Sequence, residues 1–239
     1  MILRHIIEHV RYQNWAAIVL DFVIVVLGVF IGIQLGNWNE ARHERSYQHG
    51  VLERLAEDHQ EMLLEIDDFI RIQKDVFRAT TRMMELVESP DAPEQPDVIR
   101  RDLATIFSGR PPPSRSATMM ELISSANMRL ISDETLRASL LEMDRSIVGA
   151  SVTFDIFLKS WVAKEDNFIS KVVFHDALNE DGTIMPPSVA SYDLAGMRAD
   201  PGILAHLSFR RRSTALLIDY LQARRAEVVS VLDLLEHQK

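Results

Sequence analysis

Histidines and acids at helical spacing are the residues of this chain that could hold a metal or move a proton. His5 and His9 lie four residues apart, a spacing that places two possible metal ligands on one helix face. Glu40-x-x-His43 has the spacing used by di-iron helix bundles, which need a second such element and further glutamates. The chain has no second Glu-x-x-His, so these residues are better explained as polar groups at a membrane surface.

Three further histidines have weaker claims to chemistry. His59 lies between Asp58 and Glu61, but it falls in an apolar column of a long predicted helix. We therefore expect a core or interface histidine there rather than a ligand or proton relay. His175 beside Asp176, and the isolated His206, offer no readable nucleophile–base spacing.

Catalytic motifs and cysteines are both absent from the sequence. There is no phosphate-binding glycine loop, no G-x-S-x-G and no H-E-x-x-H. Without cysteine there is no disulfide framework, thiolate zinc site, iron–sulfur cluster or cysteine nucleophile. We predict no catalytic residue, no cofactor and no metal site.

Composition and charge narrow the class of protein. The 239 residues are 47% hydrophobic and 26% charged, which is ordinary globular usage and excludes a wholly disordered chain. Nine Gly and nine Pro are too few for a many-turned β-sandwich. The net charge of −9 argues against nucleic acid as a partner, because phosphate binding needs a basic surface.

Residues 15–38 predict a transmembrane helix. As a helix, 15–36 would rise about 33 Å, which matches a hydrocarbon core of about 30 Å. Trp15 and Trp38 stand at its ends, where indoles prefer the headgroup layer. A signal peptide is a poorer interpretation because no small-x-small cleavage site follows the run. A buried core helix is the other alternative.

Orientation depends on the flanking charges. The tail, residues 1–14, has amphipathic spacing and carries Arg4 and Arg11, while more arginines follow the span. A short basic tail on a first helix usually stays in the cytoplasm. We expect a bacterial inner-membrane protein with a cytoplasmic N-terminus and a periplasmic domain formed by residues 39–239.

Small residues follow one stripe of the span. Gly28, Gly32 and Gly36 recur every four residues, a pattern that lets a second helix approach closely. Asp21 lies on the same stripe, where a carboxylate must reach the headgroups, take a proton or find a polar partner. We therefore name these four residues as candidates for helix packing in the membrane, with ordinary membrane-helix glycines as the plainer alternative.

The rest of the chain predicts an all-α fold: the membrane helix followed by an antiparallel bundle of long helices. Apolar residues recur every seven positions over 40–87, and Leu55 and Ala56 begin two adjacent columns. Proline-rich segments at 89–96 and 110–116 flank a short helix at 97–108. A further helix begins near Ala117, and a second long helix is expected from Ser132, with its capping hydroxyl, to about Leu178. We expect that helix to pair antiparallel with the first, and a last helix at 202–237 to follow a loop at 179–201.

The predicted last helix carries two groups of arginines. Arg210–Arg212 and Arg224–Arg225 could pair with the acid-rich stretch 57–68 across helices, remain on solvated faces, or bind phosphate. Charge partners or solvated faces are the simpler interpretations.

Two blocks of the sequence suggest a family. The run IGIQLGNWNEAR after an acid early in the span, and the stretch ELISSANMRLISDETLRASLLEMD at 121–144, resemble the uncharacterised bacterial single-pass membrane proteins of domain-of-unknown-function family 6090. Asn37, Trp38, Asn39 and Glu40 match the juxtamembrane motif of that family. The sequence departs from its pattern at Gly36, commonly Asn, and at Ala126, commonly Gly. The resemblance implies a basic cytoplasmic tail and an outer helical domain, and no activity, cofactor or ligand.

These observations lead to one functional prediction and one alternative. We expect a membrane-anchored helical bundle that acts through protein contacts as an accessory or scaffolding component of the bacterial envelope. Its partners would be the lipid bilayer and either a second copy or another membrane protein. The alternative is a ligand-sensing periplasmic bundle that works with a separate transducer. A pocket of several hundred Å3 between the long helices, with converging polar groups, would favour the alternative.

Overall fold

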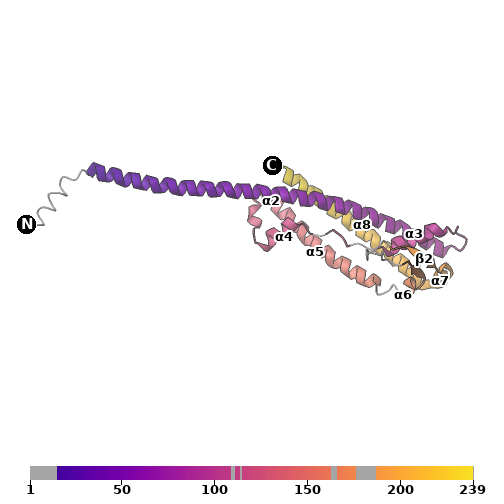
Figure 1. Cartoon of the computed structure of the whole chain (residues 1–239). Helices are drawn as coiled ribbons and strands as arrows, with labels where there is room; N and C mark the ends of the chain where they lie inside the picture. The colour runs from indigo at the N-terminus through magenta and orange to yellow at the C-terminus, as the bar shows by residue number, and fades with distance from the viewer. Residues whose placement is uncertain (1–14, 109–110, 114, 163–165, 176–186, 239) are drawn as a thin grey trace, which may run out of the picture. The chain divides into compact units, whose positions relative to one another are not determined.

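The computed structural model describes residues 15–108, 111–113, 115–162, 166–175 and 187–238 (Figure 1). Of these residues 82% are helical, and the strands described form a small two-stranded sheet, so the all-α prediction is confirmed. The chain divides into two compact units, residues 1–51 and 52–239, which we describe separately. The predicted tail at 1–14 lies outside the described residues.

The first unit consists of the N-terminal part of helix α2, Trp15–Glu88. This single helix includes the predicted span, and neither Gly36 nor Gly50 interrupts it. Good helix formers dominate its sequence after the span, and no proline occurs before Pro90. The helix prediction over these residues is therefore confirmed.

The second unit is built on three long helices: the remainder of α2, α5 (Glu134–Val162) and α8 (Pro201–Glu236). Helix α8 runs antiparallel to α2, since Arg225 near its end meets Asp67 while Arg198 just before its start meets the carbonyl of Leu86. It also runs antiparallel to α5, because Ser146 faces Glu227 and Asp133 faces Gln238. The antiparallel bundle is thus confirmed (Figure 1).

The predicted partner of α2 was nevertheless wrong. Helices α2 and α5 run in the same direction, and α8 is the antiparallel neighbour of both. The connection between α2 and α5, residues 89–133, makes this possible because it runs back along the bundle. We call it the returning segment. Its helix α3 (Pro96–Phe107) is held beside the end of α2 by Arg82 and Asp102, whereas Ser116 bonds Asp58 many turns earlier. The prolines at 111–113 lie on this part of the connection, outside any helix or strand.

The seven-residue columns of α2 form the bundle core as predicted. Every member of the column that begins at Leu55 is buried, and so are three members of the column that begins at Ala56. His59, Ile66, Gln73 and Thr80 form a third buried column, so polar residues occupy core positions there. Thr80 satisfies its hydroxyl by donating to the carbonyl of Val76 at 2.7 Å. The core of this end of the bundle therefore combines apolar packing with local hydrogen bonds.

The second long helix is shorter than predicted. Helix α5 ends at Val162, and a short helix α6 (Asp166–Ile169) and strand β1 (Val172–Phe174) take the place of its expected last turns. Strand β1 pairs antiparallel with β2 (Val189–Tyr192), which precedes helix α7 (Leu194–Ala199) in the segment expected to be a loop. The run Val172, Val173, Phe174 has strong β-propensity, and pairing with β2 overrides the apolar periodicity read as helix.

Helix α4 (Ala117–Ser124) begins where predicted and ends in a Schellman motif. The amides of Ala126 and Asn127 donate to the carbonyls of Ile123 and Leu122. Ala126 has φ +55°, a left-handed conformation that favours glycine. A 3-10 turn at Met128–Leu130 follows.

Helix α5 begins one residue later than expected. The carboxylate of Asp133, rather than the hydroxyl of Ser132, accepts the amide of Leu136 at 2.8 Å. Either side chain is a good N-cap, and the acid takes the position here.

The arginines of α8 divide into two kinds. Arg225 pairs with Asp67 of the acid-rich stretch, with Nε and Oδ1 2.6 Å apart, as the charge-partner interpretation predicts. Arg224 is buried and bonds α5 instead, and buried Arg210 lies over the ring of Trp161 at 4.7 Å. These two arginines therefore act inside the bundle.

Candidate functional site

The N-terminal part of α2 exposes a continuous apolar surface. Its large apolar side chains between Phe22 and Leu35 are 42–69% exposed, and the most apolar window of this helix has no buried residue. By length and composition, α2 is one helix that could cross a membrane. So large an exposed apolar surface is costly in water and is typical of a segment covered by lipid or by another protein.

The glycine stripe of this segment is open. A Cβ atom added at Gly28, Gly32 or Gly36 would meet no atom within 4 Å. The stripe therefore has room for a neighbouring helix to approach closely. Asp21 belongs to the helix, but its side chain, like that of Trp15, lies outside the described set.

The juxtamembrane motif continues α2 without a break. Asn37, Trp38, Asn39 and Glu40 are all helical and exposed, and Trp38 exposes 61% of its surface. His43 is also exposed, so Glu40 and His43 share one helix face with open surroundings. Within the described residues no group of three or more His, Cys, Asp and Glu could hold a metal.

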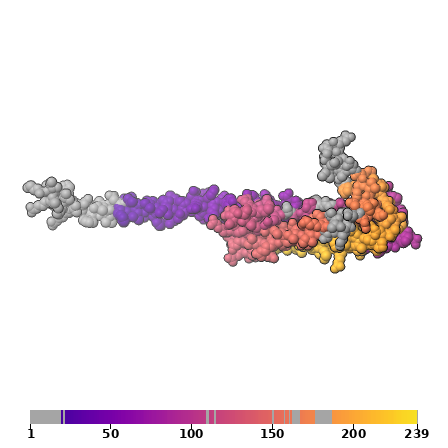
Figure 2. Space-filling view, turned by 90° about the horizontal axis from the view of Figure 1, so that it is seen from below, coloured from indigo at the N-terminus to yellow at the C-terminus, as the bar shows by residue number. Residues whose placement is uncertain are grey.

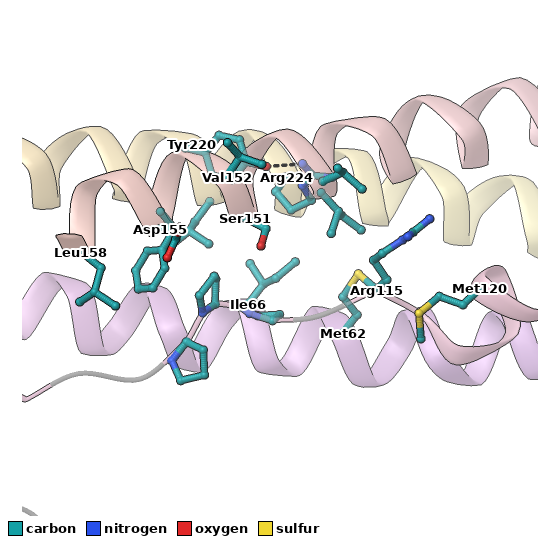
Figure 3. A pocket seen from close by; sticks show the side chains of 17 residues that line it. Met62, Ile66, Arg115, Met120, Ser151, Val152, Asp155, Leu158, Tyr220 and Arg224 are labelled. Atoms are coloured by element: carbon teal, nitrogen blue, oxygen red, sulfur yellow. Dashed lines mark hydrogen bonds between the residues drawn. The ribbon is translucent and has the colours of Figure 1, made fainter. Parts of the chain in front are cut away.

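A groove of about 590 Å3 lies in the second unit among α2, α5, α8 and the proline segment (Figure 3). Its walls are mainly apolar and include Met62 and Ile66 of α2, Val152 and Leu158 of α5, and the prolines at 111–113. A second groove of about 480 Å3, between α5 and α8, shares Pro112, Phe154 and Tyr220 with the first. The middle and end of α5 are therefore incompletely packed on both sides.

The arginines beside the main groove are already engaged by protein groups. Arg115 forms two hydrogen bonds with Asp144, of 2.6 and 2.7 Å. Arg224 donates to the carbonyl of Met143 at 2.7 Å and also bonds Ser146 and the hydroxyl of Tyr220 (Figure 3). The same hydroxyl donates to the carbonyl of Ser146 at 2.9 Å. These bonds brace α5 against its neighbours and leave the groove with an apolar character.

Asp58 joins α2 to the start of α4. Its carboxylate accepts the hydroxyl of Ser116 at 2.7 Å and the amide of Thr118 at 2.9 Å. Ser116 in turn caps α4 by accepting the amide of Met119. Burial acts to raise the pKa of Asp58, but the hydrogen bonds from Thr118 and Ser116 outweigh it and hold that pKa below its usual value.

His59 is fully buried, with 0% exposure, as expected for a core histidine. Its Nδ1 lies 2.5 Å from the carbonyl of Leu55, and its Nε2 has no hydrogen-bond partner among the described residues. Burial lowers the pKa of His59, and the bond to Leu55 and the charge of Asp58 only partly oppose this shift. Burial therefore favours the neutral form of the ring inside the bundle.

His206 and His175 lie in different surroundings within the described residues. His206 is buried against Trp161, with ring centroids 4.0 Å apart, inside the apolar cluster at the far end of the bundle. His175 is exposed, and Asp176, its proposed companion, is outside the described residues, as are His5 and His9.

Sequence reasoning missed the two carboxylates that fasten the returning segment. Asp58 was considered as a neighbour of His59 and as part of the acid-rich stretch 57–68, and Asp144 only as part of a family block. A useful signal was available in Ser116, which precedes a predicted helix and so was a candidate cap. The pairing of Arg115 with Asp144 has no local signal, since 29 residues separate them.

Comparison with known proteins gives one family and no named relative. Residues 21–93 match the model of a family of unknown function, DUF6090. Over these residues the chain is similar to the DUF6090 family. The match begins at Asp21 in the span and includes the glycine stripe, the juxtamembrane motif and the rest of α2.

The DUF6090 match ends before the second block of the resemblance, residues 121–144. No curated protein and no solved structure matches the chain. The family description supplies no activity, so any function must be argued from the molecule itself.

Proposed function

We propose that this protein is a single-pass, membrane-anchored helical bundle that acts as an accessory or scaffolding component of the bacterial envelope. The exposed apolar run Phe22–Leu35 supports this proposal most directly, because lipid would remove that surface from water. An unbroken α2 would tie the anchor to the bundle. The basic residues Arg4 and Arg11 favour a cytoplasmic N-terminus and a periplasmic bundle at the inner membrane.

Extraction and labelling test the anchor and its orientation. The native protein should stay with membranes in alkaline carbonate, and release into the soluble fraction would contradict the anchor.

Because the chain has no cysteine, Asp97→Cys introduces one exposed thiol in the bundle. An impermeant maleimide should label it in cells with a permeable outer membrane and an intact inner membrane. Labelling only after inner-membrane lysis would reverse the orientation.

In this proposal the predicted span packs against a second membrane helix. Gly28, Gly32 and Gly36 would let a second membrane helix, from another copy or another protein, approach closely. Gly32→Leu would fill that stripe, and Asp21→Ala would remove its polar contact. Both substitutions should reduce the assembly size of the protein in mild detergent. Val23→Leu, on the opposite helix face, is the matched control, and unchanged assembly in both test variants would contradict the contact.

The grooves beside α5 support the alternative, a ligand-sensing periplasmic bundle with a separate transducer. A volume of about 590 Å3 falls within the range of about 300–1,000 Å3 that small-molecule sites occupy. However, Arg115 and Arg224 in its lining already bond protein groups, so these two charged residues are engaged within the bundle rather than turned to a ligand. Scaffolding is therefore the better supported function. A thermal-shift screen with apolar ligands tests the alternative, and a ligand that raises the melting temperature of wild type but not of Val152→Asp would favour it.

A further inference from the structure

Helix α5 carries an exposed apolar ridge in the second unit. Val148, Val152 and Ile156 are spaced by four residues and are 44%, 57% and 61% exposed. Gly149 lies on the same face, and a Cβ added there would meet no atom within 4 Å. The space-filling view shows the pink-to-salmon segment that includes α5 along the face of the bundle seen from below (Figure 2). A ridge of this kind, open at a glycine, has the form of a helix-packing surface.

Two ion pairs flank this ridge in the same order. Glu142 and Arg145 lie 3.1 Å apart at its N-terminal end, and Asp155 and Lys159 lie 2.6 Å apart at its C-terminal end. All four side chains are exposed by more than half. At 3.6 residues per turn, the ridge and its four charges fall within an arc of about 140°. They therefore form one continuous face, which we call the α5 face (Glu142, Arg145, Val148, Gly149, Val152, Asp155, Ile156, Lys159).

The order of the charges along the α5 face favours a second copy of this face as the partner, in the antiparallel direction. If two copies of the α5 face meet antiparallel about a two-fold axis near residue 150, Val148 of each copy meets Val152 of the other. The same axis brings Arg145 toward Asp155 of the second copy, and Glu142 toward Lys159. A parallel pair in register would instead place every charge beside its own like. The face is thus complementary to itself in the antiparallel direction.

The dimensions of the neighbouring grooves agree with contact on the ridge. A helix about 10 Å wide and rising 1.5 Å per residue fills about 120 Å3 per residue, so the larger groove would hold only about five residues of helix. Val148 and Val152 of the ridge also line that groove and Gly149 lines the second one, so a second helix on the ridge would lie over both grooves. There Gly149, close to the axis, allows the backbones to approach.

We propose that the α5 face is a self-association surface that pairs antiparallel with the α5 face of a second copy of this chain. This contact is distinct from the contact proposed for the span, and it gives the bundle its own means of joining copies. A protein with two separate self-association surfaces can link copies into assemblies larger than a dimer, as a scaffold requires.

Cysteine cross-linking tests the pairing directly, because the natural chain contains no cysteine. The full-length double variant Val148→Cys/Val152→Cys should form disulfide-linked dimers under mild oxidation in detergent and in vesicles. Either single variant should give about tenfold less dimer, because the offset of four residues, about 6 Å along the helix, moves like cysteines beyond bridging range. Leu64→Cys, which is 71% exposed but outside the α5 face, is the background control.

Charge reversal tests the direction independently. In the double-cysteine background, Arg145→Glu should lower the dimer yield by about threefold to tenfold, because two copies of each pair change from attraction to repulsion. Adding Asp155→Arg should restore the yield by recreating opposite charges across the axis. Circular dichroism should show unchanged helix content throughout, since the altered side chains are exposed.

The outcomes separate this inference from the proposed function. No dimer above the Leu64→Cys background would overturn the α5 contact. Efficient dimers from Val152→Cys alone would overturn its antiparallel direction. Dimers that persist when Gly32→Leu and Asp21→Ala are added support an α5 contact independent of the span. If those span substitutions abolish cross-linking, the α5 face is not a self-association surface in its own right. Carbonate extraction reports on the anchor whichever result is found.

Discussion

Arg115 and Asp144 meet in a two-bond ion pair that fastens the returning segment to α5. Both bonds are short, 2.6 and 2.7 Å, and Asp144 is buried while Arg115 is partly exposed. Ser116 and Thr118, which follow Arg115 in the chain, both donate hydrogen bonds to Asp58 of α2. One short stretch of chain is therefore tied to two helices that run in the same direction, and each tie depends on a carboxylate.

Removing the first tie should destabilise the bundle. Asp144→Ala leaves the guanidinium of Arg115 without its partner, and we expect a loss of about 1–3 kcal/mol, since hydrogen bonds to charged groups contribute about that much. Thermal unfolding of the full-length protein in detergent, followed by circular dichroism, should show a melting temperature lower by several degrees. Arg145→Ala, which breaks an exposed pair on the same helix, should change it little.

The hydrogen bonds of Asp58 with Ser116 and Thr118 predict that both mutation of Asp58 and acidic pH lower the stability of the fold. Asp58→Ala removes the acceptor for Ser116 and Thr118 and should cost about 1–2 kcal/mol. Because the folded pKa of Asp58 is lowered, its ionised form stabilises the fold above the unfolded pKa, and this stabilisation is lost as the pH falls through the folded pKa. Denaturation between pH 7 and pH 3 should show a smaller acid loss in Asp58→Ala than in wild type. Equal losses would contradict this role.

His59 predicts a separate dependence in mildly acidic solution. Its pKa is lowered in the fold, so below the unfolded value of about 6.5 the unfolded chain binds a proton that the folded chain resists. Stability should therefore fall as the pH drops below that value. His59→Phe should flatten this part of the stability curve, whereas His43→Gln, at an exposed position, should leave it as in wild type. Stability that rises on acidification would refute the interpretation.

Ala126 predicts a stabilising substitution. Its φ of +55° is unfavourable for any residue with a Cβ atom, and glycine adopts it freely. Ala126→Gly should therefore raise the free energy of unfolding by about 0.5–1 kcal/mol, measured by chemical denaturation. Ala138→Gly, inside α5, is the matched control and should lower stability by a similar amount. A destabilised Ala126→Gly would contradict the role of the turn.

Removal of the anchor predicts a soluble fragment. A protein that lacks residues 1–38 loses the exposed apolar run of α2 and keeps all of the second unit. It should stay in solution without detergent and give a helical circular dichroism spectrum. A spectrum dominated by strand, or a fragment that still requires detergent, would contradict the division into anchor and bundle.

The sequence was most informative where a pattern is local and periodic. The columns that begin at Leu55 and Ala56 and the stop after Glu88 were both predicted, because spacing and proline chemistry act over a few residues. The glycine stripe was likewise predicted from spacing alone, and the structure shows it open.

Features that depend on distant pairing were not predictable in the same way. The hairpin of β1 and β2 required two short segments to meet, and in isolation Val172 and Val173 continue a helical pattern. The direction of α5 relative to α2 depends on how far the returning segment travels, and Arg115 finds Asp144 only after that return. Tertiary contacts decide such features.

The position of α8 in the chain has a consequence for biogenesis. It is the antiparallel neighbour of both α2 and α5, yet it is synthesised after both of them. Until it emerges, the apolar columns of α2 lack one of the helices that cover them. A nascent chain halted before residue 201 should therefore depend on chaperones and be degraded rapidly, because the 36-residue α8 is needed to complete the bundle.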